Sequence, residues 1–325
     1  MTGLSDSFQR PINYLRVSVT DRCNLRCIYC MPSGGIQHLP RNEVLRYEEI
    51  QLVAQAAASL GINKLRLTGG EPLVREELTQ LVQMLSHIVG IDDIALTTNG
   101  VLLKQYAASL RKAGLKRVNV SLDTLKQERY KRYTRSDRLK DVLDGMAAAR
   151  ETGLEPVKVN MVVMRGVNDD ELLDFARLTI EEGWHVRYIE LMPFANGESL
   201  QSVPTREVIE SLGSIGKLEP YLSSQGNGPA KYFRFTGARG TVGFISPISE
   251  HFCFNCNRLR LTADGKLRPC LLSDEEVDLK AALRRRASPL EIKGLIQQAV
   301  AKKPERHHLS EGLQPTGRVM CQVGG

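Results

Sequence analysis

The segment YLRVSVTDRCNLRCIYCMP, which covers Tyr14–Pro32, determines which fold the chain is predicted to adopt. It begins with a strand-like run and then places Cys23, Cys27 and Cys30 within eight residues, at the spacing C-x3-C-x2-C. A disulfide pairs two cysteines, and a structural zinc site takes four ligands. Three clustered thiolates therefore leave one position of a metal site open, and the rest of the chain must indicate what fills it.

A repeated β-α unit surrounds this segment. Amphipathic stretches of 3.6-residue period, such as YEEIQLVAQAAASLG at 47–61, alternate with short strand-like runs. The predicted strands are Tyr14–Val19, Lys64–Thr68, Ile94–Thr98, Arg117–Ser121, Val157–Val163 and Val186–Met192. Six units predict an α/β fold, an incomplete TIM-like barrel of parallel strands with helices outside. Chemistry in such folds gathers at the C-terminal ends of the strands, where the three cysteines lie.

The β-α rhythm changes after about Pro204. A stretch rich in Gly, Ser and aromatic residues follows and predicts turns and hairpins, and then come a second cysteine cluster and two helical segments. We therefore divide the chain into a partial barrel at 1–220 and a C-terminal region at 221–325 that closes its mouth.

Composition limits the class of protein and its partners. The N-terminal residues MTGLSDSFQRP lack the apolar core of a signal peptide, and no run approaches the ~18 apolar residues of a membrane span. Six of the seven cysteines fall in two clusters, which predicts metal ligation in a reducing compartment, the cytoplasm. A net charge of +7 indicates an anionic partner. We find no nucleic-acid-binding motif, so a small polyphosphate is the expected anion.

The second cluster lies in HFCFNCNRLRLTADGKLRPC, residues His251–Cys270, where Cys253, Cys256 and Cys270 have the spacing C-x2-C-x13-C. A zinc site is the alternative to an iron–sulfur cluster here, and the fourth ligand would be His251, Cys321, His307 or His308. Arg258 and Arg260 follow at alternate positions, so an extended backbone would point both the same way. Two guanidiniums beside a metal cluster suit a phosphate-bearing ligand.

Polar or glycine-rich motifs follow three further predicted strands. They are TGGEP (Thr68–Pro72), TTNG (Thr97–Gly100) and SLD (Ser121–Asp123). Glycines allow close approach of a ligand to the backbone. Each motif is weak alone, but motifs at four successive strand ends indicate one extended site.

The motif C-x3-C-x2-C, with an aromatic residue before the last cysteine, resembles that of the radical S-adenosylmethionine (SAM) superfamily. The resemblance implies that Cys23, Cys27 and Cys30 hold three irons of a [4Fe–4S] cluster and that the fourth iron binds SAM. An electron from this cluster would cleave SAM into methionine and a 5′-deoxyadenosyl radical. TGGEP would bind the amino group of SAM.

A longer series of motifs resembles one family within that superfamily, the GTP 3′,8-cyclases of molybdenum cofactor biosynthesis. From Arg16 to Gly325 the motifs are LRVSVTDRCNLRCIYCMP, LRLTGGEPLVR, LTTNG, NVSLD, KVNMVVMRGVND, RYIELMP, CFNCNRLRLT and a terminal GG. The resemblance implies a lyase that converts GTP into (8S)-3′,8-cyclo-7,8-dihydroguanosine 5′-triphosphate. It also implies a second [4Fe–4S] cluster, at Cys253, Cys256 and Cys270, whose open iron binds the guanine.

The same resemblance implies roles for single residues. The positions that match SAM ligands are Tyr29, Gly70, Ser121 and Met192. The positions that match GTP ligands are Arg16, Arg66, Thr97, Lys158, Arg187, Arg258 and Arg260. Gly324 and Gly325 would act in the active site, to which the family's tail extends, and Cys321 is a spare thiol. The implied partners are GTP, SAM, an electron donor of flavodoxin or ferredoxin type and a downstream cyclic pyranopterin monophosphate synthase. We expect a monomer or homodimer that binds neither nucleic acid nor membrane.

Two other function classes stay open at this level. A radical SAM peptide maturase with an auxiliary cluster would usually carry more cysteines in its C-terminal region, whereas this chain has one beyond Cys270. A zinc or nucleic-acid-binding protein would explain the charge but not the ordered motifs at the strand ends.

Overall fold

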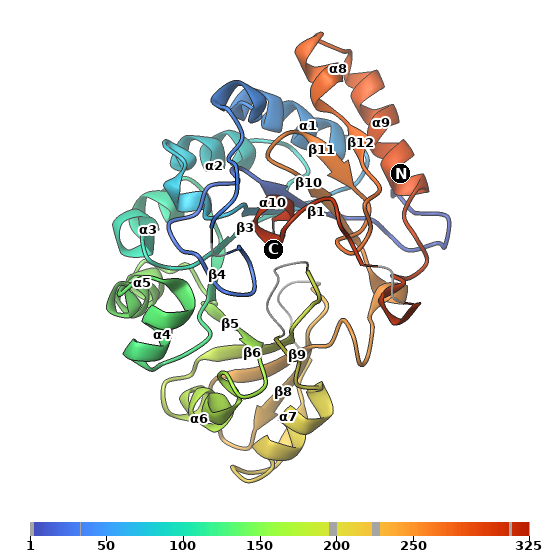
Figure 1. Cartoon of the computed structure of the whole chain (residues 1–325). Helices are drawn as coiled ribbons and strands as arrows, with labels where there is room; N and C mark the ends of the chain where they lie inside the picture. The colour runs from blue at the N-terminus through green and yellow to red at the C-terminus, as the bar shows by residue number, and fades with distance from the viewer. Residues whose placement is uncertain (1–2, 33, 195–199, 223–227, 312–313, 325) are drawn as a thin grey trace.

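A curved sheet organises the computed structural model, which describes residues 3–32, 34–194, 200–222, 228–311 and 314–324 (Figure 1). Six neighbouring strands are parallel and follow the chain order. They are β1 (Tyr14–Ser18), β2 (Lys64–Thr68), β3 (Asp93–Thr98), β4 (Arg117–Ser121), β5 (Lys158–Val163) and β6 (His185–Glu190). Every predicted strand is present, and the predicted α/β partial barrel is confirmed.

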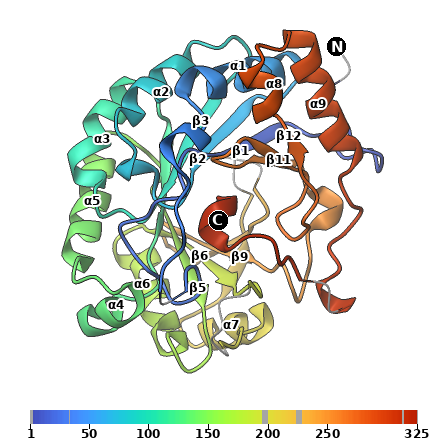
Figure 2. The same cartoon turned by 45° about the horizontal axis from the view of Figure 1, so that its top comes forward.

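Helices cover the outer face of these strands (Figures 1 and 2). They are α1 (Tyr47–Ser59), α2 (Leu78–Ser86), α3 (Leu103–Lys112), α4 (Gln127–Thr134), α5 (Leu139–Glu151), α6 (Leu172–Glu181) and α7 (Thr205–Leu212). On α1 the buried stripe is Ile50, Val53, Ala54 and Ala57, the spacing of one helical face. Leu65 and Leu67 of β2 belong to the same hydrophobic core. Arg66, between them, lines the cavity inside the barrel, because neighbouring strand residues face opposite sides.

The C-terminal region adds strands at both edges of the same sheet. β10 (Arg258–Leu261) pairs in parallel with β1, and β9 (Thr241–Ile245) pairs in parallel with β6. Among the described residues the parallel strands therefore number eight, from β10 through β1–β6 to β9. The sequence predicted six, since neither added strand belongs to a β-α repeat that periodicity can reveal.

The remaining elements complete the two edges. β7 (Leu218–Pro220) and β8 (Lys231–Phe235) are antiparallel and follow β9 in the sheet, while β11 (Lys266–Arg268) and β12 (Val277–Asp278) lie beyond β10. The proposed boundary at residue 220 falls between the paired strands β7 and β8. The last helices are α8 (Lys280–Arg284), α9 (Pro289–Ala301) and the short α10 (Met320–Val323).

The end of the chain returns to the middle of the molecule. Figures 1 and 2 both show α10, in red, within the curve of the strands. None of the described helices is long and apolar enough to cross a membrane.

Candidate active site

A cavity of about 320 Å³ lies inside the curve of the sheet. Its lining includes both cysteine triads, the four expected SAM positions and the seven expected GTP positions. The structure thus brings together residues that span Arg16 to Cys270. Their individual roles stay predictions, but their shared location is an observation about the fold.

The first triad sits on a loop that is tied to α4 and to the end of β2. The backbone N–H of Cys30 donates to the carbonyl of Cys27 at 3.0 Å, which closes a turn between these two cysteines. The N–H of Arg26 donates to Thr134 O at 3.0 Å. Burial raises the pKa of the Cys27 thiol well above its usual range and that of Cys23 to about 11. Without a metal, these thiols would stay protonated at neutral pH.

The second triad has a similar turn but a different electrostatic setting. The N–H of Cys256 donates to Cys253 O at 3.0 Å. Burial acts to raise the pKa of Cys256, but the positive charges of Arg258 and Lys303 outweigh it and lower that pKa to about 6. Lys303 is itself buried, and its Nζ donates to the carbonyls of Arg258 and Pro269 at 2.9 and 2.6 Å. These charges therefore favour the thiolate at Cys256, whereas burial raises the pKa of Cys253.

The donor chemistry of both triads suits iron–sulfur clusters. Each supplies three soft thiols, and in a cluster each thiolate binds a different iron. Within the described part of the chain, no three His, Cys, Asp or Glu side chains are arranged to hold one metal ion. Two of the suggested fourth ligands have other partners: His307 Nε2 lies 2.7 Å from Pro247 O, and His308 Nδ1 lies 3.0 Å from Glu311. Cys321 is buried and hydrogen-bonded to Cys30 of the first triad.

Buried and half-buried cations form a row across three adjacent strands. Register places Arg260 of β10 beside Arg16 of β1, and Arg16 beside Arg66 of β2. Lys158 of β5 and Arg187 of β6 approach from the other side of the cavity. Arg66, Arg187, Arg258 and Arg260 form no ion pair with a carboxylate among the described residues.

Burial and the close spacing of these cations lower the pKa values of two of them, Arg16 and Lys158. Burial, and then repulsion by Arg66 and Arg258, lowers the pKa of Arg16 to about 10, although Tyr14 partly opposes the shift. Burial also lowers the pKa of Lys158, with Arg187 adding to the effect. Desolvated like charges of this kind destabilise the empty site and favour a multiply charged anion.

Several cavity-lining polar residues escaped the sequence analysis. Tyr14 accepts a hydrogen bond from Arg66, and Tyr232 of β8 accepts one from Lys158 at 3.1 Å. Asn119 and Asn160 line the cavity with a buried side-chain oxygen that has no partner in the described structure. Tyr14 and Asn160 lie two residues from Arg16 and Lys158, so strand alternation could have identified them. Tyr232 could not be identified in this way, because it lies on β8, outside the predicted strands.

Arg187 also has unsatisfied atoms. Its Nε and Nη2 are buried and lack a hydrogen-bond partner within the described residues. Buried polar groups normally have partners. Together with the asparagine oxygens, these atoms indicate a polar ligand that fills the cavity.

The expected SAM positions lie at the cysteine loop and the strand ends. Tyr29 Oη donates to Asp123 at 2.9 Å, and burial raises the pKa of Asp123 to about 6. At Gly70, a Cβ atom would come within 2.3 Å of the Arg22 carbonyl, so only glycine allows this packing. Ser121 ends β4, and Met192 packs at the apolar cluster of Phe194, Met320 and Val323.

The C-terminal tail reaches two of the arginines. Gly324 O accepts hydrogen bonds from Arg16 Nη2 at 3.0 Å and Arg260 Nη1 at 2.8 Å. Gly324 has a φ of +71°, and a Cβ there would come within 2.7 Å of Thr68 Cγ2. Gly325 lies outside the described residues.

Two family profiles cover most of the chain. The radical SAM superfamily matches residues 17–179, and Molybdenum Cofactor Synthesis C matches residues 184–309. Similar curated proteins include a GTP 3′,8-cyclase of Pelotomaculum thermopropionicum, which is 54% identical over 99% of this chain and 100% of the relative. A GTP 3′,8-cyclase of Moorella thermoacetica is 52% identical, again over 99% and 100% of the two chains.

Solved structures share the fold at low identity. Streptococcus suis SuiB bound to precursor peptide SuiA is 13% identical, with a TM-score of 0.62 over 96% of this chain and 76% of that one. Native anSMEcpe with bound AdoMet is 14% identical, with a TM-score of 0.59 over 93% and 82%. These likenesses concern the fold alone, whereas full-length identity above one half concerns the family. The chain therefore belongs to the GTP 3′,8-cyclase family of the radical SAM superfamily.

Proposed function

We propose that this chain is a lyase that converts GTP into (8S)-3′,8-cyclo-7,8-dihydroguanosine 5′-triphosphate, the first step of molybdenum cofactor biosynthesis. One observation carries the proposal: the seven expected GTP positions and both cysteine triads line one cavity. The relatives that share about half of the sequence over their full length bear the name of this activity, which supports it further.

In this proposal the two triads hold two [4Fe–4S] clusters. Cys23, Cys27 and Cys30 bind the cluster that engages SAM, whose other contacts are Tyr29, Gly70, Ser121 and Met192. When bound, this cluster supplies the electron that cleaves SAM and so generates the radical that takes hydrogen from C3′ of the ribose. Cys253, Cys256 and Cys270 bind the second cluster, at the guanine end of the substrate.

The cations orient the substrate. The row Arg260, Arg16 and Arg66 can present guanidinium forks to a triphosphate, and Lys158 and Arg187 contribute charge from the facing strands. Thr97, which accepts a hydrogen bond from Arg66 at 3.4 Å, extends this polar surface. Arg258 lies 3.8 Å from the Cys256 sulfur, where it can bridge substrate and second cluster. Holding C3′ and C8 of one molecule in a fixed conformation is the protein's main task, because the bond forms within the substrate.

The remaining partners follow from the chemistry. The cluster needs a one-electron donor, for which we propose a flavodoxin or ferredoxin. The product requires a second enzyme, a cyclic pyranopterin monophosphate synthase, to rearrange it. We propose the cytoplasm as the location, because cysteines that bind a cluster must stay reduced, and a reducing compartment keeps them so.

The test is an anaerobic assay of the iron- and sulfide-reconstituted protein with a reductant, SAM and GTP. The parent should hold about eight irons per chain and form 5′-deoxyadenosine together with the cyclised nucleotide. Cys27→Ala should lose both products, since SAM has no cluster to bind. Cys256→Ala should keep SAM cleavage and lose cyclisation. Cys321→Ser is the matched control and should keep the full iron content.

Three outcomes would contradict the proposal. They are undiminished 5′-deoxyadenosine from Cys27→Ala, loss of both activities from Cys256→Ala, and a parent that binds zinc in place of iron. The second would indicate that Cys253, Cys256 and Cys270 serve the fold.

A further inference from the structure

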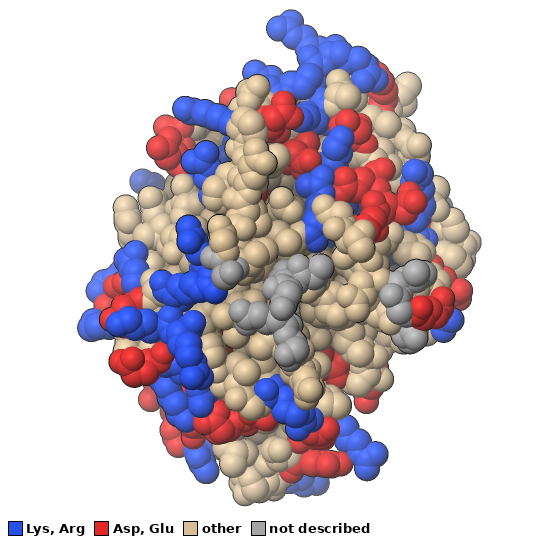
Figure 3. Space-filling view, viewed as in Figure 1, with Lys and Arg blue, Asp and Glu red and all other residues tan. Residues whose placement is uncertain are grey.

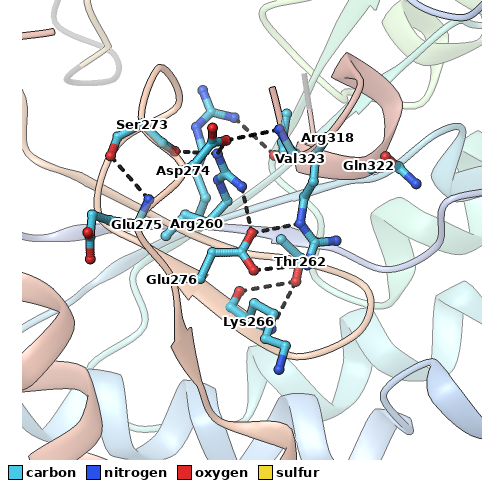
Figure 4. Close-up of polar contacts among 12 residues, drawn as sticks. Arg260, Thr262, Lys266, Ser273, Asp274, Glu275, Glu276, Arg318, Gln322 and Val323 are labelled. Atoms are coloured by element: carbon cyan, nitrogen blue, oxygen red, sulfur yellow. Dashed lines mark hydrogen bonds and ion pairs between the residues drawn. The ribbon is translucent and has the colours of Figure 1, made fainter. Parts of the chain in front are cut away.

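The C-terminal tail is fastened to one edge of the sheet by Arg318, which contacts Asp264 in the turn between β10 and β11 and Glu276 just before β12. Figure 4 shows Arg318 beside Glu276. Arg318 Nη1 and Nη2 donate to the two oxygens of Asp264 at 3.1 and 2.9 Å. Its Nε and Nη2 donate to the two oxygens of Glu276 at 2.6 and 3.0 Å. We call Arg318, Asp264 and Glu276 the Arg318 clasp.

The clasp is partly removed from water. The side chains of Arg318 and Asp264 are 15% and 14% exposed, so solvent screens this pair less than an open surface pair. Although burial opposes it, hydrogen bonding from Arg318 and Thr262 holds the pKa of Asp264 below its usual range. Doubly bidentate contacts of an arginine are also geometrically specific.

Both carboxylates are held independently of Arg318. Arg268, which is 1% exposed, donates to Glu276 at 2.5 Å. Thr262 Oγ1 donates to Asp264 at 2.6 Å. Because these contacts lie within residues 262–276 and do not involve the tail, replacing Arg318 should loosen the tail and leave this edge of the sheet in place.

A second contact ties the tail just before the clasp. Asp274 accepts hydrogen bonds from the backbone N–H groups of Thr316 and Gly317 at 2.9 and 3.3 Å. Residues 316–318 are therefore attached to the same side of the molecule by three carboxylates. These contacts fix the point from which the tail extends into the cavity.

Beyond the clasp, the tail runs to the active site in six residues. Met320 and Val323 of α10 pack against Phe194, and the N–H of Val319 donates to Gln322 Oε1 at 3.1 Å. The carbonyl of Gly324 then meets Arg16 and Arg260. A shift at Arg318 would move Gly324 relative to both arginines.

We propose that Arg318 is a positioning residue: through the clasp it sets where the tail enters the cavity and holds Gly324 against Arg16 and Arg260. Its effect on turnover rests on the proposed function, whereas its effect on the tail does not. A lysine could not replace it, because one ammonium cannot span both carboxylates in this geometry.

The test compares Arg318→Gln with Arg129→Gln in the reconstituted enzyme. Arg129 is the matched control, because it also bridges two carboxylates, Asp170 and Glu171, and is 19% exposed, but it lies on α4. Amide hydrogen exchange of residues 314–324 is measured without substrate, and cyclised product per SAM cleaved is measured with GTP. Arg318→Gln should speed exchange at Thr316, Gly317 and Gln322 at least ~10-fold and lower the product ratio about 10-fold. Arg129→Gln should change neither.

The outcomes separate the two proposals. Unchanged tail exchange in Arg318→Gln would overturn the clasp. Faster exchange with a product ratio within about twofold of the parent would overturn its effect on turnover. Arg318→Lys should resemble Arg318→Gln in both measurements, and parent-like behaviour would show that the fork is not required. A parent that forms no cyclised nucleotide would overturn the proposed function, while the exchange data would still decide whether Arg318 positions the tail.

Discussion

At the scale of single residues, Arg260 shows what the sequence could and could not reveal. Its place two residues after Arg258 on a strand-like run predicted that both side chains face one site, and both line the cavity. Its hydrogen bond to Gly324 O could not be foreseen, because 64 residues separate the two and no local pattern reports a contact at that distance. The same arginine that is proposed to bind GTP thus also binds the tail.

Gly324→Ala tests whether the backbone conformation of the tail matters. The added Cβ would lie 2.7 Å from Thr68 Cγ2, at a φ of +71° that residues with side chains rarely adopt. We expect the product per SAM cleaved to fall about 100-fold, the scale of a slightly misplaced reacting atom. Iron content and the thermal unfolding temperature should stay near those of the parent.

Gly317→Ala is the control for this prediction. It lies in the same tail, and a Cβ there would meet only Asp274, at 3.4 Å and beyond. Its product ratio should stay near that of the parent. If both variants lose product equally, general loosening of the tail is responsible; if neither does, the geometry at Gly324 has no part in the reaction.

At the scale of elements, the six β-α units could be predicted because each has its own period. Alternation on β1 could also have identified Tyr14 together with Arg16, although the sequence prediction did not include it. The apolar stripe of α1 needs no tertiary information. The edges of the sheet could not be predicted in this way. β9 and β10 pair with β6 and β1 across long separations, and strand pairing of that kind leaves no periodic trace.

His185, where β6 pairs with β9, predicts that the stability of the fold depends on pH. His185 Nδ1 lies 2.9 Å from Thr241 Oγ1, its register partner, and burial, followed by repulsion from Lys158, lowers the His185 pKa from 6.5 to about 4. The unfolded chain takes up this proton near pH 6.5, whereas the folded chain does not until about pH 4. The free energy of unfolding should therefore fall as pH drops from 6.5 to 4.

His185→Gln can still bond to Thr241 but does not titrate. Its free energy of unfolding, measured by urea at several pH values, should decline less over this window than that of the parent. His87→Gln is the control, because His87 is exposed on the surface at the end of α2. An identical slope in His185→Gln and the parent would contradict the assignment.

At the scale of the whole molecule, positive charge is divided between surface and interior. Figure 3 shows Lys and Arg side chains mixed with Asp and Glu around the rim of this face, with mainly uncharged residues near its centre. The cations of the site are instead buried on strands: Arg66, Lys158, Arg187 and Arg260. The sequence indicated the excess charge of +7, but only the fold shows that part of it faces one cavity.

This distribution of charge predicts that the buried cations lower the stability of the ligand-free chain and that binding of an anion restores it. Arg66, Arg187 and Arg260 have no carboxylate partner among the described residues. Buried charges of this kind oppose folding, so an anion that neutralises them should stabilise the chain. At 100 times its dissociation constant, GTP should add about 2.7 kcal/mol to the free energy of unfolding and raise the thermal unfolding temperature by several degrees. Inorganic tripolyphosphate should reproduce part of this shift.

Arg187→Met tests whether buried positive charge destabilises the fold when no ligand is bound. Two buried nitrogens of Arg187 lack a hydrogen-bond partner within the described structure. Methionine fills a similar volume without charge, so the variant should unfold at the same temperature as the parent or higher when no ligand is present. The increase in its unfolding temperature caused by GTP should nevertheless be clearly smaller, since one charge that is proposed to bind the triphosphate is gone. Arg177→Met, at an exposed side chain of α6 that pairs with Asp174, should change neither value. A GTP-induced shift in Arg187→Met equal to that of the parent would mean that the buried cations serve something other than the triphosphate.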